Sequence, residues 1–108
     1  MIFKRRFGEL IDRQLDLFEQ DNAELLDRVE DAEADYRAAA REEAEERFGD
    51  LQEVLAEGTD RLVEVRETYL ETLDDDAAEE YAAAFDLAVL RRFPQFALEL
   101  EEEPEEDD

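Results

Sequence analysis

Two groups of carboxylates in this chain have a spacing that suits a divalent cation. Glu43 and Glu46 lie three residues apart in an acidic run, and Glu71 and Asp74 repeat that interval further along. Residues three apart share one face of a helix, so the two carboxylates of each pair would point the same way. Carboxylate oxygens are the ligands that Mg²⁺ prefers in proteins. Glu43, Glu46, Glu71 and Asp74 are therefore candidate Mg²⁺ ligands.

The two acidic patterns, Glu-Glu-x-x-Glu and a distant Glu-x-x-Asp, resemble the magnesium site of the all-α nucleoside triphosphate pyrophosphohydrolases. The resemblance implies four carboxylates that converge between antiparallel helices and hold an ion bridging the substrate phosphates. A pattern this loose also arises by chance, however, because 36 of the 108 residues are Asp or Glu. Glu71 and Asp74 are also expected at a helix end, and no basic cluster lies nearby for the phosphates. We therefore favour a non-enzymatic protein and expect no cofactor.

The charge balance predicts a protein adapted to concentrated salt. Thirty-six acidic residues face 12 basic ones, which gives a net charge of −24. Such self-repulsion opposes compaction in dilute buffer, whereas molar salt shortens the screening length to about 3 Å. High charge with few apolar residues would indicate disorder, but 44% of residues here are hydrophobic and recur with helical period. We therefore expect a folded protein with a halophilic surface.

Several function classes are disfavoured by what the chain lacks. It has no Cys and no His, which removes thiol chemistry and the commonest general base. Lys4, Arg5 and Arg6 form the one basic cluster near aromatic residues, and three charges against −24 make a poor footprint for nucleic acid. No stretch approaches the roughly 20 apolar residues of a membrane span. We expect a cytoplasmic protein that binds neither nucleic acid nor membranes.

The periodicity predicts an all-α fold with a short helix, a long central helix and a second short helix. The expected ranges are 3–19, 22–73 and 77–92, in a helical domain over 1–96. Asp21 and Asp76 each stand three residues before a Glu, the capping-box pattern that begins a helix. An acidic, disordered tail is expected over 97–108.

The central helix carries a continuous apolar stripe with steps of three or four residues. Gly49 and Gly58 interrupt the stretch, so the chain could instead turn at either glycine. The stripe keeps its phase across both, which favours one long helix in an antiparallel helical bundle. The members of the stripe are Leu25, Val29, Ala32, Tyr36, Ala40, Ala44, Phe48, Leu51, Leu55, Gly58, Leu62, Val65, Tyr69 and Leu73.

Such a long helix would leave its middle uncovered, because the terminal helices reach only its two ends. Another copy of the chain is the simplest cover, and two-fold dimers are the commonest oligomers. We therefore expect a homodimer. The candidate interface residues are Tyr36, Ala40, Ala44, Phe48 and Leu51.

The opening sequence from Met1 to Leu15, the preference for Arg over Lys and the acidic end resemble, over the full length, the small acidic helical proteins of haloarchaea. The resemblance implies a potassium-rich cytoplasm and supplies no activity. Our first hypothesis is a protein-interaction or scaffold protein acting through a helical dimer. The alternatives are the Mg²⁺-dependent pyrophosphohydrolase and an acidic regulator or nucleic-acid mimic that binds a basic partner.

Salt should control folding. Helix content by circular dichroism and the melting temperature should both rise as KCl is increased from dilute buffer to molar concentration, because screening relieves carboxylate repulsion. A melting temperature that stays constant over this range would contradict the halophilic interpretation.

Overall fold

The computed structural model describes residues 6–96 and confirms the all-α fold, with no strand in this range. Residues 1–5 and the predicted acidic tail over 97–108 lie outside the described residues. The elements are α2 (Gly8–Asp21), α3 (Ala23–Ala38), a 3₁₀ turn η1 (Arg41–Glu43), α4 (Ala44–Leu70) and α5 (Asp75–Arg92).

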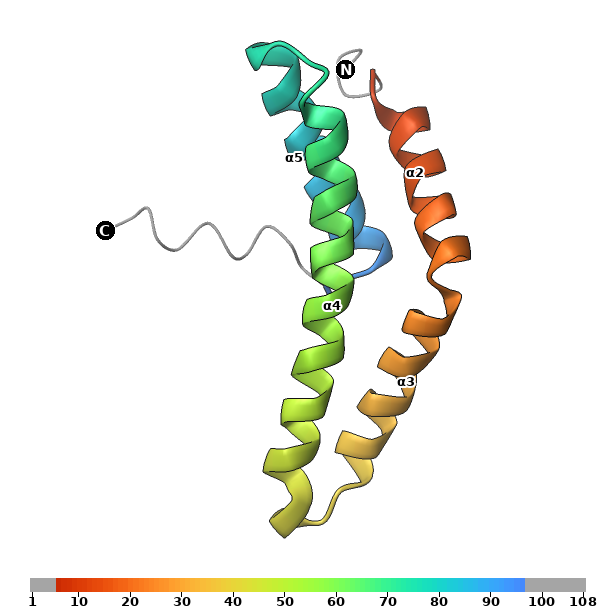
Figure 1. Ribbon diagram of the computed structural model, residues 1–108, viewed down its shortest axis with the longest axis vertical. Helices are drawn as coiled ribbons and strands as arrows, with labels where there is room; N and C mark the ends of the chain where they lie inside the picture. Colours follow the sequence, from red (N-terminus) through yellow and green to blue (C-terminus); the bar gives the residue numbers. More distant parts are fainter. Residues whose placement is uncertain (1–5, 97–108) are drawn as a thin grey trace, which may run out of the picture.

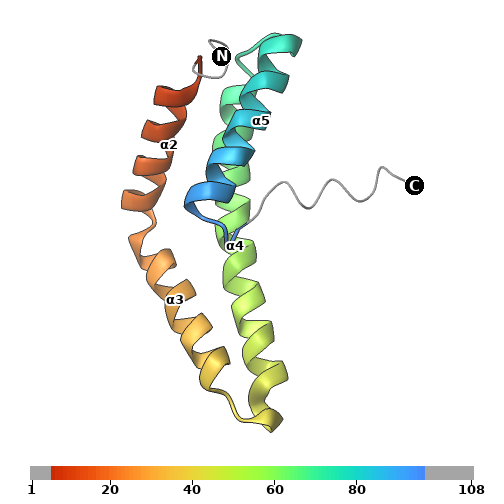
Figure 2. The same cartoon turned by 180° about the vertical axis from the view of Figure 1, so that it is seen from behind.

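Helix α4 is the axis on which the other helices are arranged. Helices α2 and α3 follow one another along a bent arm that runs beside α4 (Figure 1). Helix α5 packs against one end of α4 and against α2. In the view from behind, α5 lies in front of α4 (Figure 2). Towards the turn between α3 and α4, only these two helices of the described chain lie side by side. The molecule therefore has a three-helix end and a two-helix end.

The prediction of one continuous helix over 22–73 is wrong, because the chain turns back at Ala39 and Ala40. Both residues are extended, with φ/ψ of −69°/143° and −74°/161°, and η1 then leads into α4. The turn contains neither glycine nor proline, and its alanines are strong helix formers. Folding back lets Leu25 and Val29 join Leu51 in the buried core. Burial of these apolar side chains outweighs the small helical preference of two alanines.

Neither glycine that was considered as a break interrupts α4. Gly49 lies on the surface, and a Cβ there would meet no atom within 4 Å. Gly58 is buried, and a Cβ there would lie 2.3 Å from Cε1 of Phe96. The missing side chain at Gly58 makes room for this ring, so the segment after α5 docks on the middle of α4. The hydroxyl of Thr59 also donates a hydrogen bond to the carbonyl of Phe96 (3.4 Å).

The core is continuous and contains no residue of polar or charged type among those buried. Tyr81, Phe85 and Val89 form the inner face of α5, and each is fully buried. Phe18 of α2 packs edge-on against Phe93 and Phe96, with ring centroids 5.5 and 6.3 Å away. Aromatic pairs in this geometry stabilise a core beyond their buried area. The ring cluster therefore joins α2 to the end of α5.

The helix predicted over 3–19 is observed as α2 over Gly8–Asp21, and the two predicted capping-box starts are displaced by one or two residues. Asp21 ends α2 instead of capping α3, and Asn22 forms the bend between the two helices. Helix α5 begins at Asp75, and its cap is Asp74, whose carboxylate accepts a hydrogen bond from the amide of Ala77 (2.9 Å). The predicted end of α5 is confirmed at Arg92, two residues before Pro94.

The two internal glycines should respond oppositely to alanine. Gly49→Ala should raise the free energy of unfolding by about 0.5–1 kcal/mol, because alanine favours the helix and the site is open. Gly58→Ala should lower it by about 1 kcal/mol or more, since the overpacking cost exceeds that gain. Urea unfolding in molar KCl measures both.

Phe96→Ala provides the control, because it removes the ring that the new methyl group would meet. Gly58→Ala should become stabilising in that background. An equal gain from both alanine variants in the wild-type background would show that Phe96 does not dock on Gly58.

Candidate functional site

The four candidate magnesium ligands do not come together. Glu43 and Glu46 lie at the beginning of α4, whereas Glu71 and Asp74 follow its other end. At a rise of about 1.5 Å per residue, the 25 residues from Glu46 to Glu71 separate the two pairs by about 38 Å. No group of three or more acidic residues within 6–96 has the geometry of a metal site. The convergence that the resemblance implies is not found, because Glu43 and Glu46 lie at the beginning of α4, whereas Glu71 and Asp74 lie between its end and α5.

The candidate interface residues have three different environments. Leu51 belongs to the buried core, and Ala44 is half-buried at the beginning of α4. Ala40 is exposed in the turn between α3 and α4. Tyr36 and Phe48 are 40% and 44% exposed, and their ring centroids lie 5.4 Å apart. We call Tyr36, Ala40 and Phe48 the hairpin tip.

The large exposed apolar side chains of the described residues gather in three places. Tyr36 and Phe48 lie at the hairpin tip, and Leu17 borders a groove between α2 and α4. Leu87 and Leu90 are 46% and 43% exposed on α5. Single exposed apolar residues are common on protein surfaces, whereas groups of them mark sites of association.

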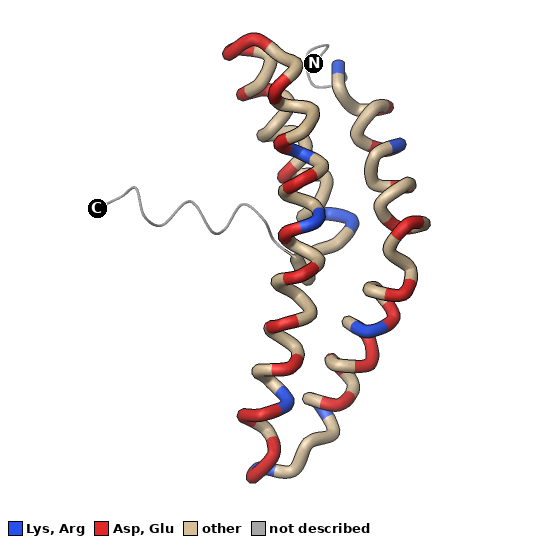
Figure 3. Tube along the Cα trace, in the orientation of Figure 1, with Lys and Arg blue, Asp and Glu red and all other residues tan. Residues whose placement is uncertain are grey.

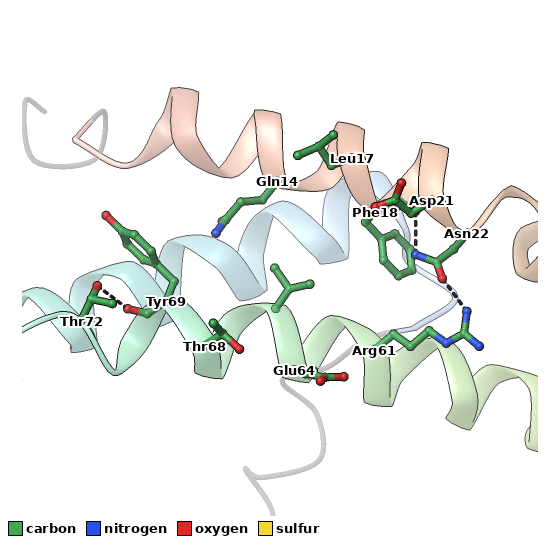
Figure 4. A pocket seen from close by; sticks show the side chains of 11 residues that line it. Gln14, Leu17, Phe18, Asp21, Asn22, Arg61, Glu64, Thr68, Tyr69 and Thr72 are labelled. Carbon is green, nitrogen blue, oxygen red and sulfur yellow. Dashed lines mark hydrogen bonds between the residues drawn. The ribbon is translucent and has the colours of Figure 1, made fainter.

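The groove between α2 and α4 has a volume of about 630 Å³ (Figure 4). Leu17, Val65 and Tyr69 supply its apolar walls. Several of its polar groups have partners inside the protein. The hydroxyl of Thr72 donates to the carbonyl of Tyr69 (2.7 Å). The amide oxygen of Gln14 accepts a hydrogen bond from the Tyr81 hydroxyl (2.8 Å).

At the bend between α2 and α3, a polar network holds the arm against α4. Asn22 donates from its amide to the carbonyl of Phe18 (2.9 Å), and it accepts from Arg61. Glu57 accepts from both Arg61 (2.6 Å) and Arg28 of α3 (2.7 Å). Exposed ion pairs contribute little singly, but several that share one carboxylate fix the position of the bend.

The perturbed titratable groups have structural roles. Burial raises the pKa of Tyr81 to about 12, and its hydrogen bond to Gln14 acts in the opposite direction. Hydrogen bonds to Glu19 (2.6 Å) and Asp16 (2.8 Å) raise the pKa of the Arg92 guanidinium. Arg66 and Asp86 form an ion pair between α4 and α5 at 2.7 Å, with both side chains mostly covered. These groups join helices to one another and do not converge on a shared cleft.

Acidic residues are spread along α2, α3 and α4 instead of forming one patch (Figure 3). No helix within residues 6–96 is long and apolar enough to cross a membrane. Comparison of the chain with protein-family models, curated proteins and solved structures finds no match. The exposed apolar surfaces are therefore the features of the molecule that point to a function.

The exposed leucines of α5 were missed by the sequence analysis. A signal was present, because Ala83, Leu87 and Leu90 follow one another at steps of four and three, away from the buried positions. Helix α5 is apolar on two faces, and periodicity alone does not show which face is covered. The structure assigns the face with Tyr81 and Phe85 to the core and leaves the other exposed.

Alkaline pH should destabilise the fold through Tyr81. The folded state keeps the phenol proton to about pH 12, whereas an unfolded tyrosine loses it near its ordinary pKa of about 10. The stability that the protonated Tyr81 phenol contributes to the folded state is therefore complete below pH 10 and is lost as the pH rises through 12. Two pKa units correspond to about 2–3 kcal/mol.

Urea unfolding in molar KCl between pH 8 and 11.5 measures this loss, with Tyr81→Phe as the control. The variant retains the other tyrosines, so its stability should decline less steeply over the same range. Equal slopes for the two proteins would contradict a structural role for the buried phenol.

Proposed function

We propose that this chain is a non-enzymatic protein-interaction or scaffold protein that acts as a helical dimer in concentrated salt. The observation that carries the proposal is the grouping of exposed apolar side chains on a protein of net charge −24. Carboxylates keep the remaining surface hydrated and repel other copies. Two protein surfaces can associate favourably only where apolar side chains interrupt this acidic surface.

The hairpin tip supports a protein partner. Tyr36 and Phe48 lie against each other and remain accessible, at the end of the molecule where α3 and α4 pack without a third helix of the described chain. Aromatic side chains are enriched among the residues that dominate binding energy at protein interfaces. An apolar patch on another protein is the complementary surface.

The two alternatives have less support. A pyrophosphohydrolase requires its carboxylates to converge, and the candidate pairs stand at opposite ends of α4. An acidic regulator or nucleic-acid mimic requires a defined acidic face, whereas the acidic residues are distributed along several helices (Figure 3). Hydration in a potassium-rich cytoplasm, the setting that we propose, accounts for acidity of this kind.

Self-association should depend on salt. In molar KCl the wild-type chain should sediment as a dimer, because apolar burial is retained while repulsion between the copies is screened. At low ionic strength, the same protein should shift towards monomer before it unfolds. Sedimentation velocity over a range of concentrations, with helix content followed by circular dichroism, measures both changes. A folded chain that remains monomeric at every salt and protein concentration would refute the dimer.

A further inference from the structure

The second half of α5 and the residues that follow it are unusual on this protein because they carry almost no acidic charge. From Tyr81 to Phe96 the chain has one acidic residue, Asp86, and two arginines, Arg91 and Arg92. Asp86 is paired with Arg66, and Arg92 is paired with carboxylates of α2. This stretch therefore has a net charge of +1 in a chain of −24. Repulsion between two copies is smallest where two such stretches meet.

The outer face of α5 has the shape and composition of a helix-packing surface. Ala83, Leu87 and Leu90 are exposed and lie on one stripe of α5, opposite the buried face of Tyr81 and Phe85. Alanine allows a second helix to approach closely, while the two leucines provide apolar area for it to cover. A groove of about 670 Å³ between α2 and α5 runs beside the stripe and is bordered by Gly8 and Ala84.

Two charged residues on the groove side of this stripe lack complete partners. Glu80 accepts a distant hydrogen bond from Arg6 (3.5 Å) through Oε1, while its Oε2 is buried without a hydrogen-bond partner. Arg91 is exposed and forms no ion pair with residues 6–96. Both side chains border the groove between α2 and α5. They lie three turns apart along α5, which is too far for them to pair within one copy.

We propose that the occupant of this face is α5 of a second copy, packed antiparallel about a two-fold axis near Leu87. The stripe of Ala83, Leu87 and Leu90 is centred on Leu87, so reversal of the helix about this residue places Leu87 against Leu87 and Leu90 against Ala84 of the other copy. This inference rests on the proposed dimer and assigns its contact surface.

Symmetry also brings the two incomplete charges together. The two-fold axis of an antiparallel helix pair is perpendicular to the plane that contains both helices. The edge of α5 that carries Glu80 and Arg91 therefore lies on the same side of that plane in both copies. With the centre at Leu87, Arg91 of one copy lies opposite Ala83 of the other. It is then about one turn from Glu80, within reach of an arginine side chain. Each Arg91 donates to the opposite Glu80, and the contact occurs twice.

This surface replaces the interface that was predicted from the sequence. That prediction assumed an uncovered middle of a single long helix, whereas α3 folds back over that region and Leu51 is buried within one copy. Pairing through α5 leaves both hairpin tips accessible, so self-association and partner binding use separate surfaces.

The first experiment compares a charge on each surface in molar KCl. Leu87→Glu should raise the dimer dissociation constant by on the order of a hundredfold, because two like charges are buried at the centre of the contact. Ala40→Glu at the hairpin tip is the matched control and should remain dimeric. Both positions are at or near the surface, so circular dichroism should show unchanged helix content.

A charge exchange tests the pairing geometry independently of burial. Arg91→Glu and Glu80→Arg should each weaken the dimer by about tenfold, and the double variant should recover to within about threefold of the wild type. Because the chain has no cysteine, Leu87→Cys also gives a clean cross-linking probe. Under mild oxidation it should form a covalent dimer, whereas Phe48→Cys should not.

The outcomes separate the two proposals. A dimer that survives Leu87→Glu and dissociates with Ala40→Glu would overturn the α5 contact and leave the proposed dimeric function intact. A wild-type chain that is monomeric in molar KCl would overturn both. Failure of the double variant to recover would contradict the antiparallel arrangement centred on Leu87.

Discussion

Burial of the apolar stripe of α4 is the constraint on which the rest of the structure depends. This helix has 27 residues and is about 40 Å long, which no other described helix matches. Helix α3 therefore covers its first half, while α5 covers its second half and α2 packs on α5. The change between the two arrangements occurs at Gly58, where Phe96 approaches the backbone of α4 most closely. Because different shorter helices cover the two halves of α4, one end of the molecule has three helices and the other has two.

The few basic residues serve mainly to join helices within this acidic chain. Arg92 connects α5 to α2, Arg66 connects α4 to α5, and Arg28 connects α3 to α4. Arginine suits this role because its planar group can bind two carboxylates and stays charged at every physiological pH. Arg92, for example, contacts both Asp16 and Glu19. Arg13, Arg37, Arg41 and Arg91 form no ion pair within residues 6–96, and of these Arg91 is the one that borders the proposed contact surface of α5.

The distribution of charge has a consequence for function. A uniformly acidic surface suppresses contact with other proteins, so the uncharged places determine where association can occur. The exposed leucines of α5 and the aromatic pair of the hairpin tip interrupt the acidic surface at two different parts of the molecule. In the proposed pairing, one surface joins two copies and the other remains available at each end. A scaffold needs this separation, because self-association must not consume the surface that binds the partner.

The sequence by itself determined the all-α class and the position at which α5 ends. These follow from local rules, since helical period, the charged last turn and Pro94 act over a few residues. Only the tertiary structure decided where the chain turns. Residues 37–43 favour a helix locally, and the break at Ala39 is stabilised by contacts between segments that are distant in sequence. For the same reason Leu87 could not be assigned to the surface. Its exposure depends on which face of α5 the neighbouring helices cover, and that is set by packing between helices and not by any one helix alone.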